Sequence, residues 1–271
     1  MPFRTYLPQP PLSSLIAYFW SYTGTNPPHS RRLTLPDGSI DLVIDLRDRK
    51  TRIHNRYDSE TTLASSVISG PQTDYYITDS SSERSMIGVH LKPGSAGPLL
   101  KLPSIKLKDT HVSLDDLWGI AATDLRDELL YSNSVEDRFR ILEKYFLLRS
   151  DWSRPSHSAV PFAIASLQQP QQSESITNLV EQVNMSAKRF IQIFKDEVGL
   201  TPKRFSRLMR FQQAVRLIRQ SKQIDWADLA MSCDYYDQSH FIKEFQSFSG
   251  LTPTEYRAIE SLHPNHIPLT S

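Results

Sequence analysis

Short runs that alternate apolar and polar residues occupy the first 110 or so positions of the chain, and residues that favour turns separate them. The clearest run, residues 39–46, follows Pro36-Asp37-Gly38, where Pro fixes φ and Gly permits a positive φ. This alternation is the period of a strand with one buried face. Similar runs occur at 64–68, 75–78 and 86–91. Several short strands at this spacing predict a small β-barrel or sandwich, cupin- or jelly-roll-like.

After Ser113 the apolar residues recur every three or four positions, which is the helical period. Ser113, followed by acidic residues, has the pattern of a helix start, and Ser134 provides a second one. We therefore expect helices over 114–131 and 134–149, which either pack on the barrel or form a dimer surface. Residues 150–156 have the composition of a linker.

Two segments 51 residues apart, 194–208 and 245–259, resemble each other. Both contain an aromatic residue, a Gly five positions later, Leu-Thr-Pro directly after it and another aromatic three positions after the Pro. An internal repeat of this kind indicates one supersecondary unit that the chain uses twice.

Each copy has the pattern of a helix-turn-helix unit. In the first copy a short amphipathic helix precedes a turn at 184–186, and aromatic residues such as Phe190 form the buried face of the next helix. In the second copy the turn lies at 234–237, and Phe241 has the equivalent position. The outer faces carry polar side chains that can bond base edges in a major groove. These are Lys188, Gln192 and Lys195 in the first copy, and Gln238, Ser239, Lys243 and Gln246 in the second.

A continuous helix is expected between the copies, from Pro202, which suits a first helical position, to Arg219. About 18 residues at ~1.5 Å each would give a connector of ~27 Å. Successive major-groove faces on one side of B-DNA lie about 34–36 Å apart. A stiff connector of this length, with some bending of the DNA, could place both second helices in adjacent grooves of one duplex.

Composition changes this picture only through the distribution of charge. The net charge is +1, which by itself indicates no nucleic-acid partner. Residues 188–222, however, contain ten basic and two acidic side chains, 10 − 2 = +8, whereas residues 1–153 contain 18 basic and 19 acidic ones. This asymmetry favours a polyanion partner for the second half, although a solvated helix face would have the same composition.

Cysteine usage and hydropathy exclude several classes of protein. The single cysteine, Cys233, cannot form an internal disulfide or a cysteine-based metal site. The sequence shows no basic-then-apolar leader and no apolar run near the ~18–20 residues that span a bilayer. We therefore expect a soluble, cytoplasmic protein with no membrane partner.

Residues 156–260 resemble the DNA-binding domain of AraC/XylS-type transcription regulators. One departure from the family pattern is Asp234 in the second turn, where Gly is usual; Asp tolerates left-handed geometry better than most residues, so the turn should form. The resemblance is carried by residues 185–195 (MSAKRFIQIFK), 199–202 (GLTP), 237–245 (DQSHFIKEF) and 250–257 (GLTPTEYR).

This resemblance implies that helices 186–197 and 237–248 enter the major groove of double-stranded DNA. It also implies a transcription regulator, more specifically an activator, with RNA polymerase as a further partner. The positions expected near bases are Lys188, Gln192, Gln238, Ser239 and Lys243. Those expected nearer phosphates are Thr201, Arg204, Arg207 and Arg210.

The N-terminal half resembles, more weakly, a domain that precedes this module in many uncharacterised bacterial regulators, through residues 35–42, 88–94 and 117–119. The resemblance implies sensing or dimerisation, so a small-molecule effector and a homodimer are expected. The fold class is therefore α+β, with an all-α second domain. The expected boundaries are 1–152 for the effector-binding or dimerisation domain, 153–262 for the DNA-binding domain and 263–271 for a C-terminal tail.

The N-terminal half lacks the patterns of an enzyme. Its histidines are scattered, and no phosphate loop, nucleophile elbow or zinc signature occurs, so neither a metal nor a cofactor is expected. Asp41 and Asp45 share one strand face and could line a pocket for a cationic ligand, or be solvent-exposed acids. His90 is either a ligand contact or a satisfied barrel residue. The alternative function is a small-molecule-binding or catalytic barrel with a degenerate helical interaction module.

Overall fold

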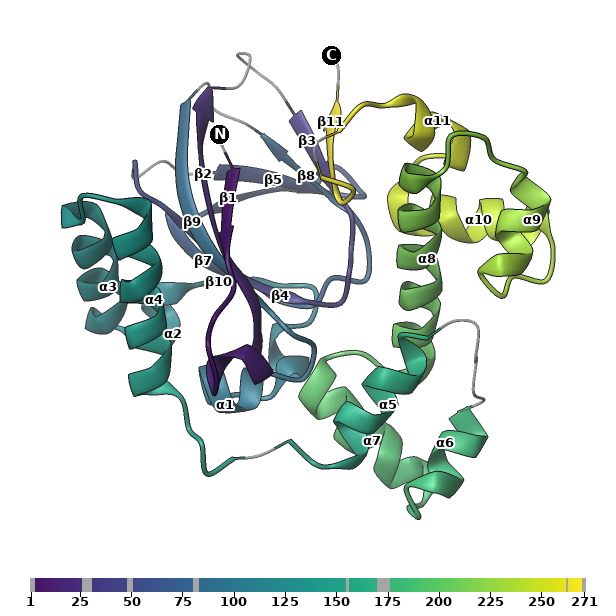
Figure 1. Ribbon diagram of the computed structural model, residues 1–271, viewed down its shortest axis with the longest axis horizontal. Helices are drawn as coiled ribbons and strands as arrows, with labels where there is room; N and C mark the ends of the chain where they lie inside the picture. Colours follow the sequence, from purple (N-terminus) through teal and green to yellow (C-terminus); the bar gives the residue numbers. More distant parts are fainter. Residues whose placement is uncertain are drawn as a thin grey trace.

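A computed structural model describes residues 3–25, 31–47, 51–79, 83–154, 156–169, 176–261 and 263–269 of the chain. A sandwich of two antiparallel sheets forms the N-terminal half, and helices form most of the C-terminal half (Figure 1). The α+β class expected from the sequence is confirmed. Of the two strand architectures expected, the structure has the sandwich and not a closed barrel.

The larger sheet has the strand order β1-β2-β9-β4-β7-β10. Its strands are β1 (Phe3–Tyr6), β2 (Ile16–Thr25), β4 (Ile40–Asp45), β7 (Ser66–Ser69), β9 (Glu83–Leu91) and β10 (His111–Ser113). The alternation in β4 separates two environments, since Ile40, Leu42 and Ile44 are buried against the outer helices, whereas Asp41 and Asp45 face the space between the sheets.

The smaller sheet has the strand order β11-β3-β8-β5-β6. Its strands are β3 (Arg31–Thr34), β5 (Thr51–Asn55), β6 (Glu60–Leu63), β8 (Tyr76–Asp79) and β11 (His266–Leu269). The two sheets face each other across a space into which alternate side chains of both project.

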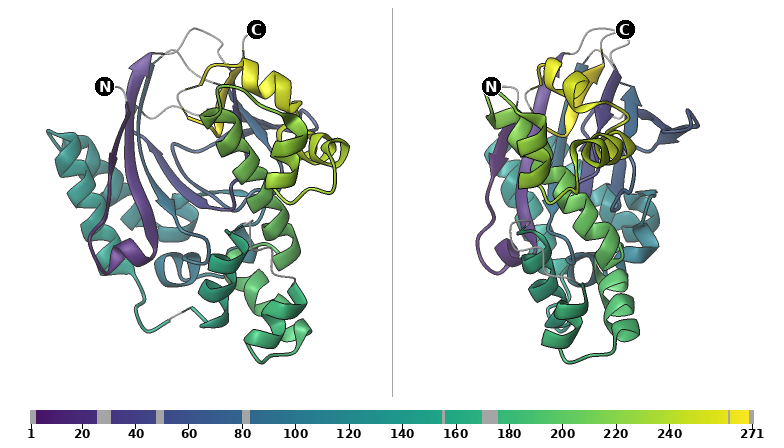
Figure 2. Two further views of the ribbon diagram at one scale, coloured as in Figure 1. Left: turned by 45° about the vertical axis from the view of Figure 1, so that its right-hand side comes forward. Right: turned by 90° about the vertical axis from the view of Figure 1, so that its right-hand side faces the viewer.

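Strand β11 corrects one expectation. The sequence predicts a C-terminal tail at 263–271, but residues His266–Leu269 pair antiparallel with β3 at the edge of the smaller sheet (Figure 2). Ile267 is fully buried opposite Leu33. Pro268 is tolerated because an edge strand has one side on which no N–H is needed. Four residues are too few to reveal a strand by alternation, and the pairing partner lies more than 230 positions away.

Helices α2 (Leu114–Trp118), α3 (Ile120–Tyr131) and α4 (Val135–Arg149) cover the outer face of the larger sheet (Figure 1). The first expected helix is broken at Gly119, whose φ of +56° and ψ of −136° suit glycine alone. The second begins as expected, because the Ser134 hydroxyl accepts a hydrogen bond from the Asp137 backbone N–H. Short helical segments α1 (Ala96–Leu100), η1 (Leu12–Ser14) and η2 (Ser104–Leu107) lie in the connections.

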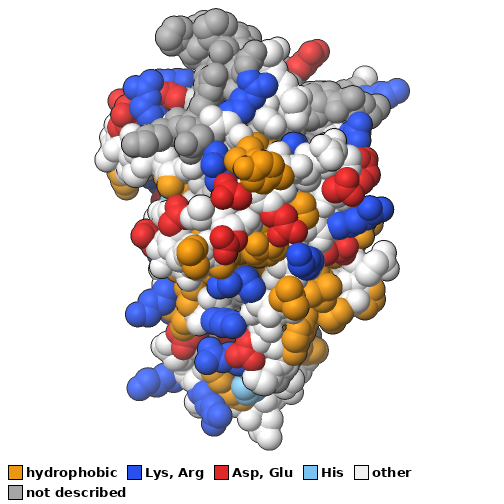
Figure 3. All heavy atoms as spheres, turned by 90° about the vertical axis from the view of Figure 1, so that its left-hand side faces the viewer, with side chains coloured by type: hydrophobic (Ala, Val, Ile, Leu, Met, Phe, Trp, Pro, Cys, Tyr) orange, Lys and Arg blue, Asp and Glu red, His pale blue; other side chains and the backbone are white. Residues whose placement is uncertain are grey.

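These helices pack on the sandwich through one face and expose apolar side chains on the other. Ile120, Tyr131 and Leu148 are between 76% and 86% exposed. Figure 3 views the molecule from this side and shows apolar side chains interspersed with charges of both signs. The homodimer expected from the sequence stays a prediction.

The C-terminal half consists of seven helices in the described part of the chain, together with the strand β11. They are α5 (Ala159–Leu167), α6 (Ile176–Gln182), α7 (Ala187–Val198), α8 (Pro202–Gln220), α9 (Trp226–Ser232), α10 (Gln238–Ser249) and α11 (Pro253–Ala258). Helix α8 is the connector that the sequence predicts, and it lies along the side of the sandwich (Figure 1). None of the helices in the described part is long and apolar enough to span a membrane.

One hydrophobic core runs from the helical half into the smaller sheet. It contains the buried aromatic rings of α7, α8 and α10 and also Leu33, Leu35 and Ile267 of the sandwich. A second core lies between the larger sheet and α1–α4. The helical half is therefore packed against the sandwich rather than tethered to it by a linker alone.

Candidate nucleic-acid interface and ligand cavity

The two helix-turn-helix units have the same backbone geometry at their turns. Asn184 in the first unit and Asp234 in the second are left-handed, with φ of +50° and +58°. The prediction that Asp234 tolerates this conformation is confirmed. Ser186 and Asp237 then cap α7 and α10 by accepting a hydrogen bond from the backbone N–H three residues later. Both second helices therefore start from equivalent turns.

The repeated Gly-Leu-Thr-Pro segments end one helix and start the next. Gly199 and Gly250 are left-handed C-caps of α7 and α10, with φ of +86° and +72°. Thr201 and Thr252 then cap α8 and α11, each with Pro in the first turn. The repeated segment thus changes the direction of the chain between two helices at the same point of both units.

The inner faces of α7 and α10 are buried, as the sequence predicts. Their aromatic rings are fully enclosed and contact one another, with centroids 5.9 Å apart for Phe190 and Phe194 and 5.8 Å for Phe241 and Phe245. This packing fixes the rotation of each helix about its axis, and with it the set of side chains that face solvent.

The outer faces present the side chains that the sequence singles out as base-proximal. All of them are exposed, and Gln192 also donates hydrogen bonds of 2.9 and 3.0 Å to the carboxylate oxygens of Asp196. The exposed set is Lys188 and Gln192 on α7, and Gln238, Ser239 and Lys243 on α10.

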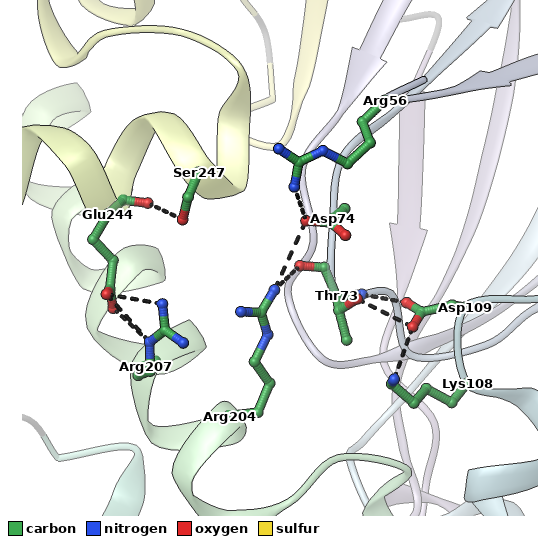
Figure 4. A network of polar contacts seen from close by, with 9 residues as sticks. All are labelled: Arg56, Thr73, Asp74, Lys108, Asp109, Arg204, Arg207, Glu244 and Ser247. Atoms are coloured by element: carbon green, nitrogen blue, oxygen red, sulfur yellow. Dashed lines mark hydrogen bonds and ion pairs between the residues drawn. The ribbon is translucent and has the colours of Figure 1, made fainter. Parts of the chain in front are cut away.

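The arginines expected near phosphates are held by other residues. Arg207 of α8 makes a forked pair with Glu244 of α10, with N–O distances of 3.0 and 3.2 Å (Figure 4). Arg210 lies 3.9 Å from the same carboxylate and donates to the backbone carbonyl of Asp234 at 2.8 Å. The side chain of Glu244 is only 7% exposed. These contacts join the connector α8 to α10, the second helix of the second helix-turn-helix unit.

Sequence reasoning missed Glu244. Its signal in the sequence is weak, since it is a single acid four positions after His240 in a helix whose polar positions were assigned to the outer face. Only the packing of α10 on α8 brings it to the arginines.

Arg204 links the connector to the sandwich. Its guanidinium donates to the backbone carbonyl of Thr73 at 2.6 Å and lies 3.8 Å from Asp74 (Figure 4). It also stacks over the ring of Phe248, 4.6 Å from the ring centroid. Burial and the neighbouring Arg207 lower the pKa of Arg204, while Asp74 opposes this shift. The structure therefore places Arg204 at an interdomain contact.

A cavity of about 670 Å³ lies between the two sheets. Asp41 and His90, the two residues singled out as weak ligand contacts, both line it, and so does Asp45. Asp45 is buried and Asp41 is half-buried at the cavity wall. The cavity is within the range of small-molecule sites, which is roughly 300–1,000 Å³.

His90 lies between two carboxylates on the cavity wall. Its Nδ1 donates to Asp41 at 2.9 Å, and its Nε2 lies 4.0 Å from Asp37. Burial opposes protonation of the imidazole, but Asp41 and Asp37 outweigh it and raise the pKa of His90 to about 9. Asp37, which the sequence presents only as a turn residue, is thus a member of this group. Among the described residues, no cluster of His, Cys, Asp or Glu has the arrangement of a metal site.

Comparison with known families divides the chain in the same way. Residues 179–259 match a family model described as a helix-turn-helix domain, and residues 4–113 match one described as a domain of unknown function (DUF6597).

Similar proteins include an uncharacterised helix-turn-helix-type transcriptional regulator of Haemophilus influenzae, 40% identical over 99 residues, which are 36% of this chain and 33% of that protein. The probable transcriptional regulator LumQ of Photobacterium leiognathi is 26% identical over 157 residues, 55% of this chain and 63% of LumQ. The chain thus spans less than two thirds of the length of each. Among solved structures, ToxT from Vibrio cholerae has a TM-score of 0.48 and 10% identity over 88% of this chain and 97% of ToxT.

The buried inner faces, equivalent turns and capped connector agree with the family match and with the resemblance drawn from the sequence. Residues 179–259 therefore form a helix-turn-helix domain that resembles those of AraC/XylS-type regulators, and residues 4–113 match a family model of unknown function.

Proposed function

We propose that the protein is a sequence-specific DNA-binding transcription regulator that reads two adjacent major-groove segments with α7 and α10. In this proposal it acts as an activator that contacts RNA polymerase, and a small molecule in the sandwich cavity regulates it. The base-proximal residues are Lys188, Gln192, Gln238, Ser239 and Lys243.

One observation carries the proposal: α7 and α10 have equivalent capped turns and buried aromatic faces, and the continuous helix α8 joins the two helix-turn-helix units. The 19 residues of α8 give a rod of about 28 Å. Because successive groove faces lie about 34–36 Å apart, a modest bend in the DNA brings both exposed faces into contact with one duplex.

Thr201, Arg204, Arg207 and Arg210 are the proposed phosphate-proximal residues. For Arg204 this role requires that its guanidinium exchange the Thr73 carbonyl for a phosphate oxygen. Arg207 and Arg210 would contribute through the exposed part of side chains that Glu244 already orients. DNA binding would then compete with the contact between α8 and the sandwich.

Fluorescence anisotropy with duplexes selected from a random pool tests the base-reading part. Gln238→Ala and Lys243→Ala should each relax the preference at particular base pairs, by about 1–3 kcal/mol per lost contact. Lys144→Ala is the matched control, because Lys144 is an exposed lysine on α4, remote from both recognition helices. Unchanged base preference in both α10 variants would contradict the assignment.

The salt dependence of the same binding reaction tests the phosphate-proximal part. Arg204→Ala should weaken binding to all sequences alike and reduce the slope of log K against log salt by about 0.9 for one lost contact. Arg140→Ala, which removes an exposed arginine from α4, should leave the slope unchanged. A selective loss at single base pairs in Arg204→Ala would contradict its role.

The alternative, a small-molecule-binding or catalytic barrel with a degenerate helical module, predicts a different outcome. The purified protein would then bind metal or a small molecule stoichiometrically and show no salt-sensitive binding to any duplex.

A further inference from the structure

Polar side chains gather at one end of the sandwich cavity, and the strand register determines which residues lie there. His90 of β9 pairs across the sheet with Tyr18 of β2 and with Asp41 of β4, so all three side chains project from one row. The ring of Tyr18 stacks on the imidazole, with centroids 4.7 Å apart and planes at 12°. Asp37 approaches the other imidazole nitrogen from the turn before β4.

This end of the cavity has an excess of negative charge. Asp37 and Asp41 contribute two negative charges, and the protonated His90 contributes one positive charge, −2 + 1 = −1. Three further imidazoles, those of His111, His263 and His266, add none near neutral pH. Burial, and for His263 and His266 also the nearby Arg32, lowers the pKa of each, to about 4 for His111. A net charge in a partly enclosed site is costly unless an opposite charge reaches it.

Aromatic faces line the cavity beside these carboxylates. Trp20 projects from the next row of β2 and lies against the bare backbone of Gly88, where an added Cβ would approach its ring to 2.4 Å. Tyr18 lines the same wall, and Tyr76 faces the carboxylates from β8 of the opposite sheet. The faces of such rings carry negative potential and attract cations, and their area accommodates an apolar body.

Arg84 lies at the far end of the cavity. Arg84 is six residues from His90 along β9, which corresponds to about 20 Å at ~3.3 Å per residue. Arg32 lies over the ring of Tyr22, between the two ends, and acts on Arg84 as well as on His263 and His266. Arg84 is 6% exposed, and its Nε has no hydrogen-bond partner among the residues that the structure describes. The far end therefore presents a buried donor that an acceptor atom of a bound molecule would satisfy.

The segment after α11 completes the site. Asn265 is buried, and its amide Nδ2 lies 3.4 Å from the Asp37 carboxylate, to which it donates. The Asn265 Oδ1 accepts a hydrogen bond of 3.1 Å from Gln212 of α8, and its backbone oxygen accepts from the Leu35 N–H at 2.9 Å. A residue beyond the helix-turn-helix domain thus contacts both the charged end of the cavity and the connector between the two units.

We propose that the cavity binds an organic cation, an amine or amidine on a flat apolar body, with its charged nitrogen on the cavity side of Asp37 and Asp41, beside His90, and its body against Trp20. Asn265 is part of this site, so the bound molecule is sensed at Gln212 of α8. The inference rests on the proposed function, because it names the class of effector that the regulator would bind.

Binding of 2-phenylethylamine and of 3-phenylpropionate to the full chain tests the inference, because the two share a ring and differ in charge. The amine should raise the melting temperature and change the tryptophan fluorescence more than the carboxylate does at equal concentration. Stronger binding of the carboxylate, or equal binding of both, overturns the proposal. So does the absence of binding by a panel of aryl amines and amidines up to their solubility limits.

Asp41→Asn and Asp37→Asn should each weaken amine binding by about tenfold to a hundredfold, the range for a hydrogen bond to a charged group. Asp116→Asn, an exposed acid on α2, is the control and should bind as the original chain does. Asn265→Ala should also weaken amine binding. Circular dichroism of each variant establishes that it is folded, and unchanged affinity in two folded cavity variants overturns the proposal.

Measurement of duplex binding in the absence of amine distinguishes a failure of the cation-binding inference from a failure of the proposed function. A chain that binds its selected duplex but no aryl cation contradicts this inference and leaves the proposed function intact. A chain that binds the amine through Asp41 but no duplex contradicts the proposed function and supports the assignment of the cavity.

Discussion

The imidazole of His90 shows how strongly a single residue depends on what surrounds it. Two carboxylates face it from one wall of the cavity, and Tyr18 covers one of its faces. Although burial alone would favour the neutral form, these carboxylates favour the imidazolium. A proton bound more tightly in the folded than in the unfolded chain contributes to stability at low and neutral pH.

The expected consequence is a loss of stability on the alkaline side of neutrality. An unfolded histidine has a pKa near 6.5, and the pKa of folded His90 is about 9. The contribution is therefore complete below about pH 6.5 and disappears as the pH rises through 9, on the order of 3 kcal/mol in total. Urea unfolding at a series of pH values should show this decline in the original chain and not in His90→Gln. Equal stability of the original chain at pH 6.5 and 9.5 would refute the assignment.

At the scale of elements, the repeated Gly-Leu-Thr-Pro turn serves both the helical units and their contact with the sandwich. A Cβ added to Gly199 would lie 2.8 Å from Pro71, and one added to Gly250 would lie 2.7 Å from Tyr75. The two turns, one from each unit, thus rest on a single loop of the larger domain. A rigid loop that contacts both turns restrains the orientation of α7 relative to α10.

Gly250→Ala should therefore reduce the free energy of unfolding through two effects. The positive φ disfavours any Cβ by about 1–2 kcal/mol, and the contact with Tyr75 adds to this. In a Tyr75→Ala background only the backbone effect remains, so the same substitution should be less destabilising. A double-mutant cycle from chemical unfolding measures the difference. If Gly250→Ala is equally destabilising in both backgrounds, the turn does not rest on Tyr75.

At the scale of the whole molecule, two adjacent glutamines on α8 contact different parts of the chain. Gln212 donates to the Pro36 carbonyl at 2.7 Å and to Asn265 at 3.1 Å, and so connects the helical half with the sandwich. Gln213 donates to the Ser232 carbonyl at 3.1 Å, within the helical half. Both side chains are buried.

Gln212→Ala and Gln213→Ala should therefore differ in their effect on the contact between the helical half and the sandwich. Gln212→Ala should lower the free energy of unfolding by about 1–3 kcal/mol, because it leaves the buried Pro36 carbonyl unpaired. Gln213→Ala should lower it less, because its acceptor belongs to the exposed Ser232. Only Gln212→Ala should increase cleavage by protease in the segment between α4 and α5 and split the calorimetric transition. Identical protease sensitivity of the two variants would show that Gln212 does not hold the halves together.

The amino-acid sequence by itself determined the features that depend on neighbours a few positions apart. The periods of apolar residues, the caps at Ser134, Ser186 and Asp237 and the turn residue Asp234 act within one or two helical turns, so α7, α8 and α10 follow from them. The 51-residue repeat needs only comparison of the chain with itself. The alternation in residues 39–46 also predicted that Asp41 and Asp45 share one strand face. It did not predict which part of the chain lies against that face.

Tertiary structure alone decided which distant groups meet. Strand β11 exists because the edge of β3 offers partners to a segment too short to form a strand unaided. Arg204 turns to Thr73 rather than to solvent, because the sandwich packs against α8. Asp37, His90 and Asn265 form one site only because two sheets and the end of the chain close around it. Periodicity identifies the two faces of a strand, but the burial and charge of a face depend on which distant part of the chain lies against it.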